Sequence, residues 1–314
     1  MTAVLAEPVD AFLHEALFYR DDLDFLAGVL PFVREGLELD EAVLVAEPPA
    51  RLDLLSDALG DDASALTLLD MAEVGRNPAR IIGVWDRLLH EHTAAGRRLR
   101  GVGEPAFAGR RESEYLECRL HEHLLNQAFD GGTPWRLLCP YDETRLPRAV
   151  VRAALHSHPA AGTSAGRRPC PDYDPGEVAG LFAAPLPVPG EAVLRGTYGP
   201  GDIPATRRTV AQYARRSGLP DDKVEALELA ASELATNSVR HGGGSGSVAM
   251  WTTPSAAVVE FHDLGHLTDP LTGRLMPSLE QEGGRGVFLV NQVCDLVQLR
   301  SSGRGTTVRL TTWL

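Results

Sequence analysis

The sequence predicts two domains of different fold class: an α/β domain built on a parallel sheet, followed by an α+β sandwich. Three observations predict this. The chain has 314 residues, more than one hydrophobic core of roughly 250 residues usually supports. Short apolar segments alternate with helical patterns up to about residue 159, which is typical of a parallel sheet covered by helices. Beyond that point helical patterns and strand pairs occur in blocks, which is typical of helices beside an antiparallel sheet.

The first domain is expected to span residues 11–159. Apolar residues at helical spacing over 12–34 predict a helix at its start. Short apolar segments predict buried strands, and these lie at 40–47, 65–71, 98–105 and 135–142. Helical patterns follow them at 50–60, 77–95, 111–129 and 146–159. This alternation predicts a parallel sheet with helices on both faces.

Residues 160–190 are rich in Pro, Gly and Ala and show no periodicity, so we expect a linker there. The second domain is expected to span 191–314. Pro220 and Asp221 mark the start of its long helix, and Gly242 marks the end. Its expected elements are a strand at 192–199, helices at 204–218, 221–242 and 284–293, a hairpin of 247–253 and 255–263, and a hairpin of 295–302 and 306–313.

Composition limits the functional classes. Hydrophobic residues make up 44% and charged residues 23%, as in ordinary globular proteins. The net charge is −13, mostly from residues 1–160, so direct nucleic-acid binding is not expected. The sequence shows neither a signal peptide nor a run of roughly 18 apolar residues, which predicts a cytoplasmic protein without a membrane span. The cysteines are widely spaced without a C-x-x-C pair, so neither a zinc site nor a disulfide framework is expected.

The most informative motif is the helical segment ELAASELATNSVRHG at 228–242. Glu233 and Asn237 are four residues apart, so their side chains lie one above the other on the same helix edge. A carboxylate and an amide placed in this way can hold a hydrated Mg²⁺ ion. The alternative for this segment alone is an ordinary solvent-facing polar edge.

Three shorter motifs follow in order. HDLG at 262–265 places Asp263 at a strand end, where its carboxylate can accept a proton from an exocyclic amine, and Gly265 leaves room for a flat base. GGRGVFLVNQVCD at 283–295 places Gly284 and Gly286 where helix amides can face a phosphate. GTTVRL at 305–310 places Thr306 where it can reach a phosphate oxygen. Each motif alone is also compatible with an ordinary turn or cap.

In this order and spacing, the boxes resemble the GHKL nucleotide-binding family, and residues 201–314 look like its anti-sigma-factor, serine-kinase branch. The resemblance implies a Bergerat ATP-binding fold that uses ATP and Mg²⁺. It implies that Asn237 ligates Mg²⁺ and that Glu233 acts as general base or positions the water on the metal. It further implies that Asp263 recognises adenine, and that Gly284 and Gly286 hold the phosphates beneath a lid drawn from 267–283.

The same resemblance implies an anti-sigma-factor regulator that binds a sigma factor and phosphorylates a serine of an antagonist protein, and it implies a homodimer. Leu267 departs from the pattern, because the first glycine box normally has a second glycine there. A side chain at that point can narrow the adenine pocket or stiffen the lid. The alternative is therefore a nucleotide-binding protein that sequesters its partner without phosphotransfer.

A sensor histidine kinase is a further alternative. It requires a helical hairpin with a phosphoacceptor histidine before the ATPase domain. The sequence instead has a Pro/Gly-rich segment upstream of residue 201, and His156 and His158 precede Pro159, as at a helix end. This arrangement favours the serine-kinase branch.

The first domain resembles the MEDS sensory family, through FLHEALFYRDD with His14, GLELDEAVLVAEPPARL, GEPAFAG and CPYDETRLP. The resemblance implies a RecA-like topology and a sensory role. No P-loop is expected, because Pro48 and Pro49 follow the strand where G-x-x-x-x-G-K-[ST] would be needed.

Four expected strands of this domain end in a carboxylate, namely Glu47, Asp70, Glu104 and Asp142. Ligands of parallel sheets bind at the carboxyl ends of the strands, so these residues are candidates for a small-molecule effector pocket near His14. The alternative, which we favour, is that they cap the helices that follow.

Overall fold

The computed structural model describes residues 10–187, 194–277 and 284–314. Contacts between Cα atoms divide the chain into two compact units, which are described separately. The first comprises residues up to Gly75 together with Val84–Glu177, and the second comprises Arg76–Gly83 and Val178–Leu314. Among the described residues, no helix is both long and apolar enough to cross a lipid bilayer.

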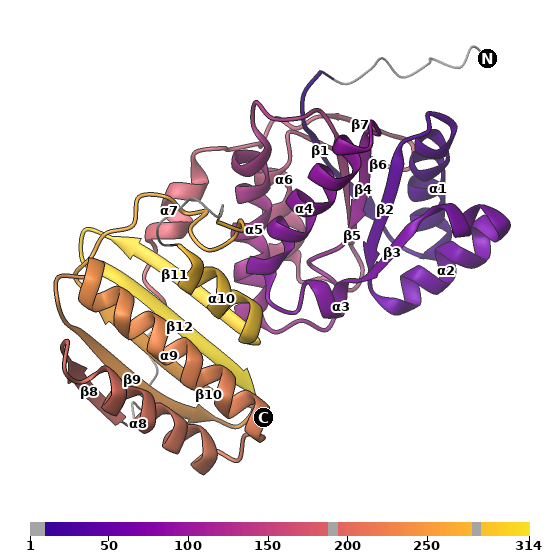
Figure 1. Ribbon diagram of the computed structural model, residues 1–314. Helices are drawn as coiled ribbons and strands as arrows, with labels where there is room; N and C mark the ends of the chain where they lie inside the picture. Colours follow the sequence, from indigo (N-terminus) through magenta and orange to yellow (C-terminus); the bar gives the residue numbers. More distant parts are fainter. Residues whose placement is uncertain (1–9, 188–193, 278–283) are drawn as a thin grey trace. The chain divides into compact units, whose positions relative to one another are not determined.

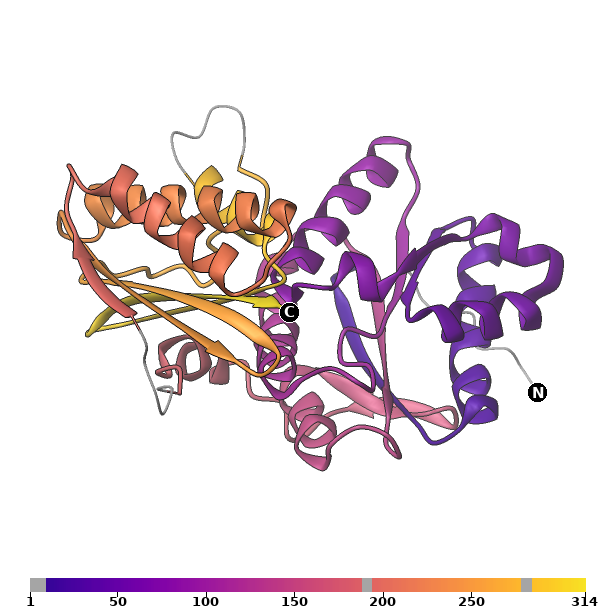
Figure 2. The ribbon, with the colours of Figure 1, turned by 90° about the horizontal axis from the view of Figure 1, so that it is seen from below.

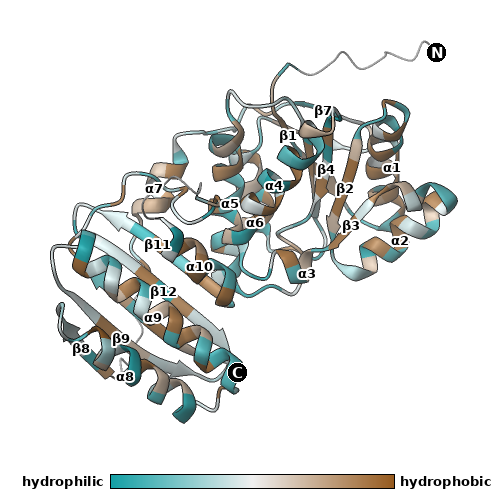
Figure 3. Cartoon of the chain, in the orientation of Figure 1, coloured by the Kyte–Doolittle hydropathy of each residue, from teal (hydrophilic) through white to brown (hydrophobic). Residues whose placement is uncertain are grey.

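The first unit is an α/β domain around a seven-stranded sheet with the order β3-β2-β4-β5-β1-β6-β7 (Figure 1). The strands are β1 (Leu13–Tyr19), β2 (Ala42–Glu47), β3 (Thr67–Asp70), β4 (Leu99–Gly103), β5 (Arg136–Asp142), β6 (Ala160–Thr163) and β7 (Gly166–Pro169). All neighbouring pairs are parallel except β6 and β7. The parallel sheet expected from the sequence is confirmed. Strands β2 and β4 are buried along their whole length, and β2 is largely brown in Figure 3.

Helices cover both faces of this sheet. They are α1 (Asp22–Glu38), α2 (Pro49–Leu59), α3 (Met71–Val74), α4 (Ile81–Ala94), α5 (Glu112–Phe129) and α6 (Arg148–Ser157), with a 3₁₀ turn η1 (Gly60–Ala65). The 3₁₀ turn η2 (Pro78–Arg80) and the first three residues of α4 belong to the second unit. One hydrophobic cluster joins α1 and α2 to side chains of β1, β2, β4 and β5. Gly101 and Gly103, both on β4, lie directly against the ring of Trp85 from α4. A side chain at either glycine would displace this ring, so the close packing of α4 depends on them.

The helix expected over 12–34 is wrong in its first half. Residues Leu13–Tyr19 form β1, which lies between β5 and β6, and the helix begins only at Asp22. A strand buried on both faces is apolar almost throughout and therefore lacks the alternation that marks a half-buried strand. Asp21 separates the two elements, because its side chain accepts a hydrogen bond from the backbone N–H of Asp24 and caps α1.

The structure also differs from the linker expected over 160–190. Residues 160–169 form the β6–β7 hairpin, which extends the sheet beside β1. Glu177–Ala183 then form α7. A hairpin of four-residue strands is too short to show periodicity, so its Gly- and Ala-rich sequence resembles a linker. Part of the expected linker, residues 188–190, lies outside the described residues.

The second unit is an α+β sandwich. Its antiparallel sheet has the order β11-β12-β10-β9-β8. The strands are β8 (Leu194–Tyr198), β9 (Gly246–Thr253), β10 (Ala256–Asp263), β11 (Leu296–Ser302) and β12 (Gly305–Trp313), and the helices are α8 (Ile203–Arg216), α9 (Asp221–His241) and α10 (Arg285–Val293). The three helices lie side by side on one face of the sheet (Figure 2). This is the fold class expected from the sequence.

Helix α9 occupies the centre of the helical layer. Its buried positions recur at intervals of three and four residues, and they are Val224, Leu227, Ala230, Ala231, Leu234, Ala235 and Ser238. They pack against buried residues of β9, β10 and β12 in one hydrophobic cluster. Because this apolar stripe fixes the rotation of α9, the polar residues at its edge also have fixed positions.

Candidate functional site

The edge of α9 carries two of the expected site residues. Glu233 and Asn237 are half-buried and lie one turn apart beside the buried stripe. Gly286, near the start of α10, lies directly against them. A Cβ atom at Gly286 would be 2.6 Å from Oε2 of Glu233 and 3.4 Å from Nδ2 of Asn237. Glycine at this position therefore allows the backbone of α10 to approach the carboxylate and the amide.

Gly284 begins α10 in a conformation that other residues rarely adopt. Its φ angle is 81°, in the left-handed region, and it precedes the first helical residue, Arg285. The first backbone N–H groups of a helix have no partner within the helix and are suited to bind an anion.

The third part of the site is the carboxyl end of β10, where Asp263 is held by two donors. Ser238 Oγ donates to Oδ2 of Asp263 at 2.6 Å, and the backbone N–H of Gly265 donates to Oδ1 at 2.8 Å. Tyr198 completes the chain by donating its hydroxyl to Ser238 Oγ at 2.9 Å. Burial and the nearby Asp263 carboxylate raise the pKa of Tyr198, so its hydroxyl remains protonated and can donate. The Asp263 side chain is therefore fixed in one orientation.

Two glycines bring the end of α9 close to Asp263. A Cβ atom at Gly242 would lie 2.4 Å from Cγ of Asp263, and one at Gly265 would lie 2.8 Å from the backbone oxygen of His241. The sequence identified Gly265 as a site residue but missed the roles of Ser238 and Gly242 in holding Asp263. Ser238 belongs to the buried stripe of α9, so its spacing alone predicts a packing role.

Thr306 contacts the loop that follows β10. Its hydroxyl donates to the backbone oxygen of Gly265 at 2.8 Å and lies 2.9 Å from Ser301 Oγ. Ser301 Oγ in turn accepts from the backbone N–H of Leu267 at 2.8 Å. Thr306 and Ser301 therefore fasten the loop after β10 to the β11–β12 hairpin.

Most of these residues, but not Tyr198 or Ser301, line one cavity of about 590 Å³. The expected site residues on its wall are Glu233, Asn237, Asp263, Gly265, Gly284, Gly286 and Thr306. Leu267 also lines the cavity and packs against the hydrophobic core. Arg240, His241 and Arg285 add basic side chains to the wall. Of the lid expected over 267–283, residues 278–283 lie outside the described residues.

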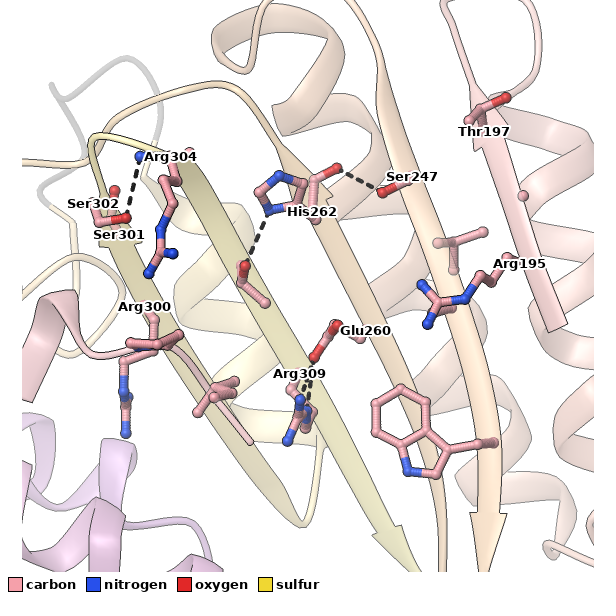
Figure 4. A pocket seen from close by; sticks show the side chains of 18 of the residues that line it. Arg195, Thr197, Ser247, Glu260, His262, Arg300, Ser301, Ser302, Arg304 and Arg309 are labelled. Atoms are coloured by element: carbon pink, nitrogen blue, oxygen red, sulfur yellow. Dashed lines mark hydrogen bonds and ion pairs between the residues drawn. The ribbon is translucent and has the colours of Figure 1, made fainter. Parts of the chain in front are cut away.

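The opposite face of the same sheet has another cavity, of about 760 Å³ (Figure 4). Its wall includes Arg195, Arg300, Arg304 and the ion pair between Arg309 and Glu260. None of the expected site residues lies on this wall. The residues expected to bind nucleotide therefore line the cavity on the helical side of the sheet and not this one.

Two models of known protein families match the chain, one after the other. Residues 13–159 match the model of the MEDS family, the methanogen/methylotroph, DcmR sensory domain. Residues 198–312 match the model of the histidine kinase-like ATPase domain. The chain joins a MEDS domain to a histidine kinase-like ATPase domain.

No curated protein matches the chain. Among solved structures, the RsbU and RsbW domains of Rv1364c from Mycobacterium tuberculosis align with 15% sequence identity and a TM-score of 0.29. The alignment covers 38% of this chain and 32% of that one. At this TM-score the likeness does not support any inference about the fold or function of either domain.

The cavity of the ATPase domain has features that fit Mg-ATP. Asn237 and Glu233 provide the oxygen ligands that Mg²⁺ prefers. Asp263 is an oriented acceptor for an exocyclic amine, and the backbone at Gly286 leaves the space beside Glu233 that a Cβ atom would fill. The beginning of α10 presents backbone N–H groups.

In the MEDS domain, two of the expected effector residues form a buried carboxyl pair. Glu47 and Glu104 lie at the ends of neighbouring strands and are no more than 2% exposed. Burial and the proximity of Glu104 raise the pKa of Glu47 well above its usual range, and burial raises the pKa of Glu104 to about 7. Tyr19 donates its hydroxyl to Oε1 of Glu104 at 3.0 Å. A cavity of about 330 Å³ lies here, lined by Tyr19, Arg51, Glu104 and Asp142 among others.

The other two expected carboxylates accept hydrogen bonds from backbone N–H groups. Asp70 caps α3 by accepting from the backbone N–H of Ala72 at 2.8 Å. Asp142 accepts from the backbone N–H groups of Thr144 and Arg145 at 3.0 Å each. Asp70 therefore fits the capping alternative. Asp142 holds only the turn after β5, because α6 begins at Arg148, and it lines the cavity of about 330 Å³ together with Glu104.

His14 does not lie near the carboxylates, contrary to the expectation. It pairs with Leu137 near the beginning of β1 and β5, whereas Tyr19 pairs with Asp142 at their ends. Five residues of strand separate the two positions by about 17 Å. The error follows from the misassigned helix over 12–34, because a strand running through the centre of the sheet places its two ends at opposite edges.

His156 and His158 lie at the end of α6 in the MEDS domain. His158 is fully buried, and His156 pairs with Glu177 at 3.3 Å. A phosphoacceptor must reach the phosphate of another domain, which a fully buried imidazole cannot do. The structure thus offers no support for a phosphoacceptor at His158.

Proposed function

We propose that the C-terminal domain binds Mg-ATP in the cavity between α9, α10 and the sheet, and transfers the terminal phosphoryl group to a serine of a partner protein. One observation carries this proposal: Glu233 and Asn237 from α9, Asp263 from β10 and Gly286 from α10 line the same cavity of about 590 Å³. These residues come from three separate motifs whose individual interpretations were ambiguous.

Each residue has a chemical role in this proposal. Asp263, fixed by Ser238 and Gly265, accepts a hydrogen bond from the exocyclic amine of adenine. Asn237 ligates Mg²⁺, which neutralises charge on the phosphates. Glu233 is the general base: its carboxylate accepts the proton of the attacking serine hydroxyl, or it orients a water on the metal. Backbone N–H groups at the start of α10 bind phosphate oxygens.

The partners are inferred from the sequence motifs. ELATNSVRHG, HDLG and GGRGVFLVNQVCD resemble the boxes of anti-sigma-factor serine kinases. We therefore infer that the chain regulates transcription in the cytoplasm, by binding a sigma factor and phosphorylating the antagonist that would release it. A homodimer of the ATPase domain is part of this proposal.

The MEDS domain is the sensor in this proposal. The buried pair of Glu47 and Glu104, with Tyr19 and Arg51 beside the cavity of about 330 Å³, is the candidate site for a small effector. Binding there would control the ATPase domain.

A second candidate function is supported by Leu267. Its side chain lines the cavity where the family pattern has glycine, and its backbone N–H is tied to Ser301. A loop fixed in this way favours retention of nucleotide over rapid turnover. In this alternative the protein binds nucleotide as a structural ligand and sequesters its partner without phosphotransfer.

Radiolabelled ATP distinguishes the two functions. The full-length protein would be incubated with γ-labelled Mg-ATP and candidate antagonist proteins that contain an accessible serine. Label on the antagonist, lost in the Glu233→Gln variant, supports the kinase. Measurable ATP affinity without label transfer to any antagonist supports sequestration and contradicts the kinase.

A further inference from the structure

Four chemically reactive side chains meet inside the MEDS domain, away from the cavity at the strand ends. They are His14 from β1, Glu122 from α5, Cys139 from β5 and His158 after α6. One ligand atom from each lies within 4.8 Å of all the others. Each of the four residues is at most 2% exposed.

The outer nitrogen of each histidine faces a hydrogen-bond acceptor. His14 Nδ1 lies 3.1 Å from Asn126 Oδ1. The orientation of that amide is fixed, because Asn126 Nδ2 donates to the backbone oxygen of Ser157 at 2.7 Å. His158 Nδ1 lies 2.7 Å from the backbone oxygen of Ala154. Both imidazoles therefore carry hydrogen on Nδ1, and their Nε2 lone pairs face the centre of the cluster.

The centre of the cluster consequently contains acceptors facing acceptors. Glu122 Oε2 lies 3.1 Å from His14 Nε2 and 3.4 Å from His158 Nε2. Within the described part of the chain, three of these atoms have no hydrogen-bond partner: both carboxylate oxygens of Glu122 and Nε2 of His158. Buried polar atoms without partners are unfavourable by a few kcal/mol each, about 1–3. A cation at the centre would satisfy all of them at once.

Protons alone are a poor solution. The Cys139 thiol, 3.3 Å from His14 Nε2, can donate to that nitrogen, but this leaves His158 Nε2 and both Glu122 oxygens without partners. Protonating both Nε2 atoms instead gives two imidazolium ions whose ring centroids are 4.0 Å apart. Only one carboxylate faces them, so the buried cluster would retain a net positive charge. A metal ion ligated by neutral imidazoles, carboxylate and thiolate avoids two adjacent imidazolium ions.

We propose that His14, Glu122, Cys139 and His158 form a four-coordinate site for a divalent transition-metal ion, with Zn²⁺ as the best match. Zinc bonds of about 2.1 Å in a tetrahedron give edges of about 3.4 Å between ligand atoms. Three of the six separations between ligand atoms are 3.1 Å from His14 Nε2 to Glu122 Oε2, 3.3 Å from His14 Nε2 to Cys139 Sγ, and 3.4 Å from His158 Nε2 to Glu122 Oε2, and all six are within 4.8 Å. A set of two nitrogens, one oxygen and one sulfur suits zinc and excludes Mg²⁺ and Ca²⁺.

This inference reverses the expectation, drawn from cysteine spacing, that no zinc site is present. The four proposed ligands, at positions 14, 122, 139 and 158, are far apart in the sequence, and only the fold brings them together. The ion would tie α5 and the end of α6 to the central strands β1 and β5. An apolar cavity of about 470 Å³, lined in part by Glu122 and Ser157, offers a route by which the ion can enter.

The contact between Cys139 and His14, with Asn126 behind the ring, has an alternative explanation as a nucleophilic thiol. A catalytic cysteine must meet its substrate, and Cys139 is only 1% exposed. Metal ligation is the use that this burial allows.

Cobalt provides the test, because Co²⁺ occupies zinc sites and reports its ligands by absorption. The full-length protein would be freed of metal with a chelator, checked for its fold by circular dichroism, and titrated with Co²⁺. We expect saturation at one ion per chain, a thiolate-to-cobalt charge-transfer band in the near ultraviolet, and intense visible bands typical of tetrahedral cobalt. Added Zn²⁺ should abolish all of these bands.

Variants identify the ligands. Cys139→Ser should lose the charge-transfer band. Cys118→Ser is the matched control, since Cys118 is equally buried in the same domain but donates to the backbone oxygen of Pro105 at 3.2 Å; it should keep the band. If Cys139→Ser does not fold, the wild-type spectrum and elemental analysis of the purified protein show whether the metal ion is bound. A folded wild type that yields no charge-transfer band, or a Cys139→Ser protein that retains it, overturns the proposal. Neither result depends on nucleotide binding.

Discussion

The hydroxyl of Ser238 donates a 2.6 Å hydrogen bond to Oδ2 of Asp263 and so connects the buried stripe of α9 with the carboxyl end of β10. Oδ1 of the same carboxylate accepts from the backbone N–H of Gly265. Asp263 is thereby oriented before any ligand arrives, which reduces the entropy lost when a base binds.

Ser238→Ala should weaken nucleotide binding. The substitution removes one donor to Asp263 and the acceptor of the Tyr198 hydroxyl. A lost hydrogen bond to a charged group is worth about 1.5 kcal/mol or more, so the dissociation constant for Mg-ATP should rise roughly tenfold by calorimetry. Thr209→Ala is the control, since Thr209 is exposed and its hydroxyl donates to the backbone oxygen of Ala205 within α8. Equal affinities for the two variants would show that Asp263 does not need Ser238.

Gly286→Ala should reduce phosphoryl transfer more than it reduces stability. The new Cβ atom would lie 2.6 Å from Oε2 of Glu233, the end of a flexible side chain that can move aside. Glu233 would then leave the position required for catalysis, and the transfer rate should fall about a hundredfold or more. Thermal unfolding should change little. Gly303→Ala, which meets nothing within 4 Å, is the control. A normal transfer rate in Gly286→Ala would contradict the role assigned to this contact.

Leu267→Gly should distinguish the two proposed functions. Leu267 lines the cavity and packs against the core, so its removal should lower the free energy of unfolding by about 1–3 kcal/mol. If Leu267 restricts the loop, nucleotide release should accelerate in the variant. Stopped-flow release of a fluorescent ATP analogue measures this rate. Release that is no faster than in the wild type would remove the reason for favouring sequestration.

The buried carboxyl pair should make the MEDS domain less stable as the pH rises. Burial raises the pKa of Glu104 to about 7 from 4.5. Below about pH 4.5 this carboxyl is neutral in the folded and the unfolded chain, so it contributes no difference. As the pH rises to about 7 the unfolded chain ionises first, and stability is lost by an amount on the order of 2–3 kcal/mol.

Glu104→Gln isolates this effect, because the amide stays neutral at every pH. In urea unfolding at several pH values, the free energy of unfolding of the variant should increase relative to that of the wild type between about pH 4.5 and 7. A constant difference over this interval would show that Glu104 ionises normally in the folded protein. Asp70→Asn is a control at an exposed cap on the same sheet edge.

The sequence predicted most of the fold because local patterns determine it. The stripe of α9 and the turn residues between β9 and β10 and between β11 and β12 are short-range signals, and the structure contains all three. The errors concern segments whose surroundings decide their form. Residues 13–19 became a strand because β5 and β6 flank them, and residues 160–169 became a hairpin because β1 offered a free edge.

The two candidate sites differ in the same way. Glu233, Asn237, Asp263 and Gly286 belong to motifs that span a few residues each, so their chemistry was visible in the sequence. The ligands His14, Glu122, Cys139 and His158 occur singly on separate elements, and no local spacing marks them. His14 was consequently expected at the wrong end of the sheet.

The central claim is that the cavity of the ATPase domain binds Mg-ATP through Asn237 and Asp263. Isothermal calorimetry of the folded full-length protein, beside Asn237→Ala and Asp263→Asn, tests it most directly. We expect saturable, magnesium-dependent binding to the wild type and affinities at least about tenfold weaker for both variants. Absence of binding heat over a range of temperatures, with the fold intact and magnesium present, would contradict it, as would equal affinity in all three proteins.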